Sequence, residues 1–205
     1  GVRLEEHLRE RGLNVVRRTN LTTDSEVPDA DHHILTGGAT STTSTSGWMV
    51  AALGRLQTML TRAGEGRCTV TGVCLGAQMI AEASCPGSVR RGSSIEVGFA
   101  EILWSGPTAE QSIVVPAFHY EEIMPACIRT AGGTVRASNQ HSSVQAFDIG
   151  PRVRGVQFHP ELTPTDVQQL IAAHRDTIRA HGGSVADAED SVTRLEALWS
   201  RQLFD

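Results

Sequence analysis

The segment 72–78 holds a single cysteine, Cys74, between two glycines. It follows an apolar run over 68–73 that predicts a strand, and it leads into a helix-like stretch over 75–83. A strand that turns sharply into a helix needs small flanking residues, because larger side chains would clash at the turn. We expect the residue at the tip to be exposed at a helix N-terminus, where backbone amides and the helix dipole stabilise a thiolate. The segment therefore predicts a nucleophilic cysteine on a strand-to-helix turn.

A second segment, 155–161, carries a histidine and a glutamate at the end of another apolar strand. A thiolate nucleophile needs a base, and the base needs an acceptor that orients it. His159 and Glu161 supply both, and Pro160 between them fixes one backbone dihedral. The two segments together predict a catalytic triad of Cys74, His159 and Glu161.

The composition limits the chemistry that the chain can perform. It has 205 residues, a net charge of −5 and no lysine. This length is enough for one sizeable core, so we expect a single domain over 1–205. Without lysine the chain has neither a Walker-type phosphate-binding lysine nor a lysine that forms a Schiff base with pyridoxal phosphate. We therefore predict no cofactor, and a step that used ATP would need another chain.

The distribution of charge and of apolar residues narrows the partners and the location. No basic stripe points to nucleic acid, no apolar run is long enough to span a bilayer, and no signal peptide is visible. The cysteines show no CxxC pair and no short disulfide-type spacing, which favours a reducing cytoplasm. His32 and His33 are adjacent, and neighbours on a strand point to opposite faces, so no metal site is predicted.

The order of the expected elements indicates the fold class. The early part alternates helices and strands, which predicts a parallel sheet, and the middle holds short runs rich in β-branched residues, which predict an antiparallel part. We expect an α/β fold in three layers: a mostly parallel central sheet, helices on both faces and a smaller antiparallel part. Because such sheets usually open on a buried strand, we also expect a first strand before residue 1. The expected helices are 2–11, 48–63, 75–83, 166–181 and 187–202; the expected strands are 13–17, 32–36, 68–73, 94–104, 112–118, 134–139, 144–149 and 152–158.

The two motifs together resemble the class I (triad) glutamine amidotransferases. These motifs are the Gly-x-Cys-x-Gly-x-Gln pattern of 72–78 and the His-Pro-Glu run of 159–161. Residues 36–38 (Thr-Gly-Gly) match the glycine loop of that family, and the resemblance covers nearly the whole chain. The segments 96–99, 137–139 and 144–147 are similar to the subset that resembles GMP synthetase.

The resemblance implies a reaction and a set of roles. Cys74 would attack the side-chain amide of glutamine to give a γ-glutamyl thioester, His159 would hand a proton to the departing ammonia, and Glu161 would orient His159. No metal and no cofactor take part in this chemistry. The remaining site residues implied by the resemblance are the glycine loop with Gly37 and Gly38, an oxyanion hole formed by the amides of Gly38 and Leu75, and a glutamine pocket lined by Gln78 and by His119 in the segment 118–120.

Two departures from the family pattern leave the substrate open. Ala39 stands where a proline often follows the two glycines, and the segment 118–121 only loosely matches the His-centred loop of the family. In one hypothesis the substrate is free glutamine and the ammonia passes to a separate ATP-using synthetase subunit; in another, the chain is a stand-alone γ-glutamyl peptidase or amidase acting on a γ-glutamyl conjugate. A third hypothesis, an inactive regulatory subunit, conflicts with the complete triad. We favour the first, because Gln78 and the glycine loop are intact.

Overall fold

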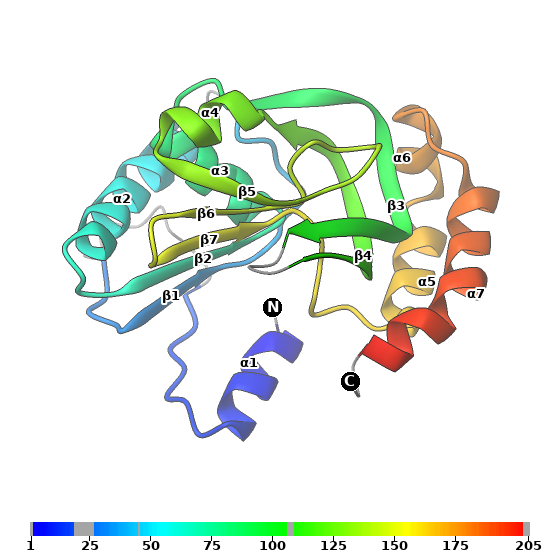
Figure 1. The fold of residues 1–205 in the computed structure, drawn as a ribbon, viewed down its shortest axis with the longest axis horizontal. Helices are drawn as coiled ribbons and strands as arrows, with labels where there is room; N and C mark the ends of the chain where they lie inside the picture. Colours follow the sequence, from blue (N-terminus) through cyan, green and yellow to red (C-terminus); the bar gives the residue numbers. More distant parts are fainter. Residues whose placement is uncertain (1, 19–26, 45, 106–108, 203–205) are drawn as a thin grey trace.

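The computed structural model describes residues 2–18, 27–44, 46–105 and 109–202. Its elements form one curled sheet with helices on both faces (Figure 1). In chain order they are α1 (Val2–Glu10), β1 (His32–Leu35), α2 (Gly47–Gly64), β2 (Thr69–Val73), α3 (Leu75–Ser84), β3 (Val89–Ser105), β4 (Glu110–Ile123), α4 (Pro125–Thr130), β5 (Gly133–Ser138), β6 (Ala146–Ile149), β7 (Val153–Val156), α5 (Pro164–Ala173), α6 (Arg175–Ala180) and α7 (Val185–Gln202).

The sheet is mixed, with strand order β1-β2-β7-β6-β5-β3-β4. The pairings β1–β2 and β2–β7 are parallel, and the other four are antiparallel. The α/β class with helices on both faces is therefore confirmed, but the antiparallel part is larger than the parallel part among the described strands. The reason is that the middle strands follow one another through short connections, and a short connection can only join antiparallel neighbours.

Two groups of helices bury the two faces of the sheet. On one face, buried side chains of α2, α3 and α4 pack against β2, and Met49, Leu56 and Ile80 are among the most deeply buried of them. On the other, α5, α6 and α7 pack against the β3–β4 hairpin through a second apolar cluster. Figure 1 shows these helix groups at opposite ends of the molecule, with β2 and β7 running between them.

The long hairpin is tied closely to the last helix. Gly98 on β3 has a φ of +104°, and a Cβ there would collide with Ser191 on α7. The Ser191 hydroxyl accepts a hydrogen bond from the Phe99 backbone N–H (2.9 Å) and donates one to Ala188 O (2.6 Å). A glycine at this position lets the hairpin approach the helix backbone closely.

Several expected elements differ from the structure. The strand expected over 13–17 does not form; this stretch pairs with no described strand, and Val16 is 66% exposed. A strand needs a neighbour for its backbone hydrogen bonds, so β-type residues alone were insufficient. The helix expected over 166–181 is divided at His174 into α5 and α6, and the short helix α4 was not predicted. Within the described residues, no helix has the length and apolar character needed to cross a membrane.

Candidate active site

Cys74 lies at the sharp turn between β2 and α3. Its backbone has φ 50° and ψ −109°, the only positive φ of a non-glycine residue in the described part of the chain. The turn is held on both sides, because the Cys74 N–H donates to Val156 O on β7 (2.8 Å) and the Gln78 N–H donates to Cys74 O (3.0 Å). The predicted strand-to-helix turn is therefore present, with its cysteine at the N-terminal end of α3.

The two glycines around Cys74 are required by close backbone contacts. A Cβ on Gly72 would lie 2.5 Å from Ala77 N, and a Cβ on Gly76 would collide with the Leu35 carbonyl of β1. Real Cβ atoms do not approach other atoms this closely. The glycines thus allow β2 to turn tightly into α3 and allow α3 to pack against β1.

His159 and Glu161 follow β7, the strand next to β2. The His159 Nδ1 and Glu161 Oε1 atoms are 2.8 Å apart, and both side chains are only 13% exposed. The His159 backbone N–H donates to Pro116 O on β4 (2.9 Å), which fixes the start of this segment against the hairpin. Because β2 and β7 are parallel neighbours, the residues that follow them emerge at the same edge of the sheet.

The glycine loop after β1 lies against these residues. A Cβ on Gly37 would be 2.8 Å from Cε1 of His159 and 3.4 Å from Cβ of Cys74. A Cβ on Gly38 would be 2.9 Å from Cδ2 of Leu75. The structure therefore brings Cys74, His159, Glu161 and the two glycines together, although they come from three separate parts of the chain.

The charges of this cluster reinforce one another. Burial by itself would lower the pKa of His159, but hydrogen bonds and charges from Cys74 and Glu161 outweigh it and raise that pKa to about 10. Burial would raise the pKa of Glu161, but the hydrogen bond and charge of His159 hold it below the ordinary value. At neutral pH the cluster therefore holds a protonated imidazole next to an ionised carboxylate.

The Cys74 side chain is more enclosed than the sequence predicted. It is only 6% exposed, because it packs in an apolar cluster that includes Val73, Val115 and Phe158. Its thiol donates to Phe118 O (3.8 Å), and Nε2 of Gln157 donates to its sulfur (3.9 Å). The expectation of an exposed tip was wrong, because the turn itself projects outward but the β3–β4 hairpin lies over it.

Two of the residues expected in the glutamine pocket have their polar atoms occupied within the protein. Gln78 is buried, and its Nε2 donates to Oε1 of Gln157 (3.3 Å). His119 is 3% exposed, with Nε2 2.8 Å from Glu96 Oε2 and Nδ1 3.1 Å from Glu121 O. The hydrogen bonds of these two side chains therefore go to other residues than Cys74 and His159.

The sequence analysis did not single out Gln157 or the Phe118 carbonyl, which both contact the Cys74 sulfur. Gln157 lies within the strand-like run that ends in His159, and its position two residues before the histidine was the available signal. The Phe118 carbonyl carried no sequence signal, because any residue provides a backbone oxygen. Among the described residues, no group of three or more His, Cys, Asp or Glu side chains is arranged to hold a metal ion.

Comparison with known proteins identifies the family. The glutamine amidotransferase class-I family model matches residues 3–175. The chain belongs to this family. It is therefore a cysteine-dependent amide hydrolase of the glutamine amidotransferase type.

Individual relatives agree with the family. The chain is 29% identical to the glutamine-hydrolysing subunit of GMP synthase from Methanococcus vannielii over 167 residues, which cover 77% of this chain and 78% of that protein. A glutamine amidotransferase of Thermotoga maritima has the same fold, with a TM-score of 0.71, 20% identity and coverage of 98% of this chain and 87% of that one. A glutamine amidotransferase of Methylobacillus flagellatus aligns with a TM-score of 0.66 and 18% identity over 97% and 88% of the two chains.

Proposed function

We propose that the chain hydrolyses the side-chain amide of free glutamine with Cys74, His159 and Glu161 as its catalytic triad, and that the ammonia passes to a separate synthetase subunit. The observation that carries this proposal is the contact of Cys74 with His159 beside Gly37, with Glu161 2.8 Å from the other side of the ring. A nucleophile, a base and an orienting acceptor in this order are sufficient for acyl transfer.

The reaction has two halves. The Cys74 sulfur attacks the amide carbon of glutamine, and His159 gives its proton to the departing nitrogen, so that ammonia leaves and a γ-glutamyl thioester remains. Water then attacks the thioester with His159 as base, which releases glutamate and restores the thiol. Glu161 keeps the ring oriented and stabilises its positive charge throughout both halves, as its short contact with Nδ1 allows.

The negative oxygen that forms in each half needs hydrogen-bond donors. We assign this role to the backbone amides of Gly38 and Leu75. Leu75 is the first residue of α3, so its amide has no partner four residues earlier within the helix. Gly38 lies directly against Leu75, which makes a common donor site reasonable. Loss of one donor of this kind costs about 2.7–4 kcal/mol in other acyl-transfer enzymes.

The roles proposed for the pocket residues follow their surroundings. Because both ring nitrogens of His119 and the amide of Gln78 are engaged inside the protein, we assign neither a direct contact with glutamine. The synthetase partner is proposed from the name of the M. vannielii relative, which describes one glutamine-hydrolysing subunit of a GMP synthase. A cytoplasmic location remains a prediction from the cysteine pattern.

The experiment that tests this function compares two substrates. The purified chain, alone and with candidate synthetases, is assayed for ammonia release from glutamine and for cleavage of a γ-glutamyl anilide. Ammonia release from glutamine that is lost in Cys74→Ser supports the proposal. Cleavage of the anilide with no activity on glutamine in any combination would instead identify a stand-alone γ-glutamyl amidase.

Covalent labelling separates an enzyme from an inactive protein of the same fold. A chloroketone analogue of glutamine should add to Cys74 and leave the partly exposed Cys85 and Cys127 unlabelled, which peptide mass spectrometry can read. A folded protein that fails to form the Cys74 adduct would contradict the assignment of this residue as nucleophile.

A further inference from the structure

A buried polar network lies beside the candidate active site, and Glu96 on β3 is its centre. Glu96 is 8% exposed. Its Oε1 accepts a hydrogen bond from Asn139 Nδ2 (2.6 Å), and its Oε2 accepts from Gln145 Nε2 (2.6 Å) and lies 2.8 Å from His119 Nε2. Buried carboxylates need partners of this kind, because an unpaired charge in the interior is costly. Three segments outside β3 therefore converge on one carboxylate.

The geometry around His119 indicates the charge of its ring. One ring nitrogen faces the Glu96 carboxylate, and the other faces the Glu121 carbonyl at 3.1 Å. A neutral imidazole has a single N–H, whereas the protonated ring has two. Because both neighbours are oxygen acceptors, both hydrogen bonds form only when the ring carries two protons. The pair is then a buried carboxylate with a buried imidazolium.

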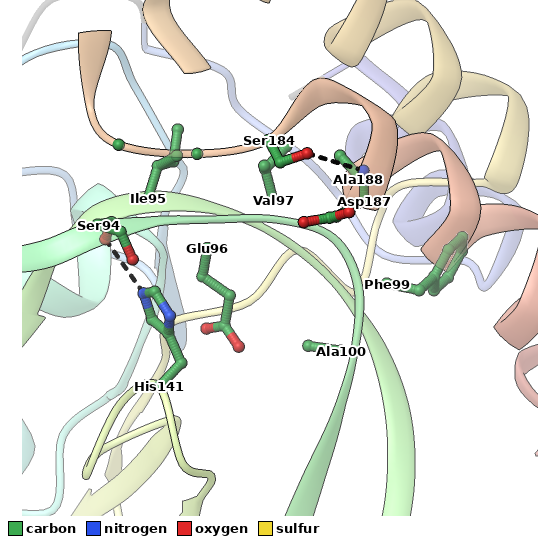
Figure 2. A pocket seen from close by; sticks show the side chains of 12 residues that line it. Ser94, Ile95, Glu96, Val97, Phe99, Ala100, His141, Ser184, Asp187 and Ala188 are labelled. Carbon is green, nitrogen blue, oxygen red and sulfur yellow. Dashed lines mark hydrogen bonds between the residues drawn. The ribbon is translucent and has the colours of Figure 1, made fainter. Parts of the chain in front are cut away.

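The carboxylate side of the pair is consistent with this assignment. Burial would raise the pKa of Glu96, but the hydrogen bond and charge of His119, together with Asn139 and His141, hold it below the ordinary value. Glu96 also lines a polar pocket of about 330 Å³ between β3, His141 and the start of α7 (Figure 2). The described residues that line this pocket include no arginine, so the positive charge that faces Glu96 comes from the histidines.

Figure 2 also shows which side of β3 the carboxylate occupies. The Glu96 side chain extends on the side of His141, whereas Ser184 and Asp187 lie across the strand. The His141 Nε2 is 3.2 Å from Ser94 O, and its ring stands edge-on to that of His119 with centroids 6.1 Å apart. The carboxylate therefore points toward the buried histidine and away from the acidic side chain of Asp187.

Two sets of contacts connect this pair to the reacting groups. His119 follows Phe118 on β4, whose carbonyl accepts from the Cys74 thiol, and the nearby Pro116 carbonyl accepts from the His159 backbone N–H. On the other side, the Gln145 carbonyl accepts from the Gln157 N–H (2.8 Å), and the Gln157 side chain donates to the Cys74 sulfur. Fixing His119 and Gln145 at Glu96 thus fixes the backbone that touches both Cys74 and His159.

We propose that Glu96 and His119 form a buried ion pair whose role is to position β4 against Cys74 and His159, so that both are positioning residues for the amide hydrolysis. The catalytic consequence rests on the proposed function. The ion pair and its effect on β4 do not, so they are tested separately.

The first measurement asks whether the ion pair exists. Nitrogen NMR of histidine-labelled protein distinguishes a protonated ring from both neutral tautomers, and the His119 signals are assigned by their loss in His119→Gln. We expect the doubly protonated pattern for His119 at neutral pH in the wild-type protein. A neutral ring would overturn the proposal, whatever the enzyme's activity.

The second measurement asks whether the pair positions β4. In Glu96→Gln, the amide proton of His159, which donates to Pro116 O, should exchange with solvent at least about 10-fold faster, because local opening of β4 becomes easier. The amide of Val70 in the distant β2–β7 pairing should keep its rate. Glu101→Gln is the matched control, since Glu101 is an exposed glutamate on the same strand.

The third measurement concerns catalysis. Glu96→Gln should lower kcat for glutamine by about 10- to 100-fold with KM within about 3-fold, because small misplacements of reacting groups affect turnover more than binding. If Glu96→Gln does not fold, the double variant Glu96→Gln/His119→Gln, which removes both charges, replaces it. A folded variant with the kinetics and the His159 exchange rate of Glu101→Gln would overturn the positioning role. A wild-type protein that hydrolyses no glutamine would contradict the proposed function, while the histidine spectrum and the exchange rates would still decide this inference.

Discussion

Cys74 has a backbone conformation that side chains rarely adopt, with φ 50° and ψ −109°. Such a conformation costs about 1–3 kcal/mol and persists only where the surroundings hold it. Here the hydrogen bonds to Val156 O and from the Gln78 N–H hold it, and the strained turn directs the sulfur toward His159. At the scale of single residues, the site is thus a nucleophile whose orientation is fixed by its backbone, beside a histidine whose charge is fixed by its neighbours.

Replacement of the nucleophile should separate activity from stability. We expect Cys74→Ala to lower glutamine hydrolysis by at least about 10³-fold, because no other group can form the thioester. Only one buried sulfur is removed, so the variant should remain folded with a melting temperature close to that of the wild type. Steady-state kinetics and thermal unfolding followed by circular dichroism check both statements. Cys127→Ala, outside the site, is the control, and a disordered Cys74→Ala would mean that the thiol is structural.

The two partners of the nucleophile should differ in importance. His159→Ala removes the group that carries the proton, whereas Glu161→Gln keeps the ring and only weakens its orientation across the 2.8 Å contact. We expect Glu161→Gln to retain about 10- to 100-fold more kcat than His159→Ala. Parallel measurement of kcat in the two variants tests this order, and equal losses would contradict an orienting role for Glu161.

At the scale of elements, the close approach of α3 to β1 and β2 decides where the nucleophile lies. Gly76 sits in α3 directly against the Leu35 carbonyl, whereas a Cβ added to Gly54 in α2 would meet no atom within 4 Å. The same residue type therefore has opposite reasons in two helices. In α3 it allows close packing, and in α2 it only lowers the intrinsic stability of the helix.

One substitution should consequently have opposite effects in these helices. Gly76→Ala should destabilise the protein by roughly 1–3 kcal/mol, because the added methyl group meets backbone that cannot move away. Gly54→Ala should stabilise it by about 0.5–1 kcal/mol, because alanine is the better helix former at an exposed site. Urea unfolding of both variants measures the two free energies, and a stabilising Gly76→Ala would refute the packing explanation.

At the scale of the whole molecule, the mixed sheet brings distant segments to one place. The parallel strands β1, β2 and β7 deliver the glycine loop, Cys74 and His159 to one edge, and the antiparallel hairpin β3–β4 covers that edge with the carbonyls of Pro116 and Phe118. The protonated His159 is a product of this assembly, since Cys74 reaches it from a different strand. The stability of the whole fold is therefore linked to the protonation of this one ring.

This linkage predicts how stability depends on pH. An exposed histidine has a pKa of 6.5, and His159 in the folded protein has a pKa of about 10. The folded state then binds one proton more than the unfolded state between these values, so the contribution is complete below pH 6.5 and is lost as the pH rises through about 10. From about pH 7 to 8.5 the free energy of unfolding should fall by up to about 1.4 kcal/mol per pH unit.

Urea unfolding of the wild type and of His159→Gln across this range tests the linkage. The variant lacks the titrating group, so its stability should change much less with pH. If both proteins lost stability at the same rate, His159 would not be the linked group.

Which parts of the fold and of the site were predictable depends on how local their causes are. The helices around 48–63 and 75–83 and the turn at Cys74 follow from periodicity and from small residues at fixed positions, which act within a few residues. The strand expected over 13–17 failed because a strand depends on a distant neighbour, and the helix expected over 166–181 divided at His174 because periodicity does not reveal a local break.

The sequence by itself determined the chemical groups: a cysteine between glycines, a histidine and a glutamate in one short motif, and the absence of lysine. The tertiary structure alone decided that Cys74 is enclosed by β4, that Gln78 and His119 form hydrogen bonds inside the protein, and that Glu96 collects partners from three other segments. The physical reason is that residue identity fixes what a side chain can do, whereas burial and charge pairing arise from segments that meet only when the sheet is complete.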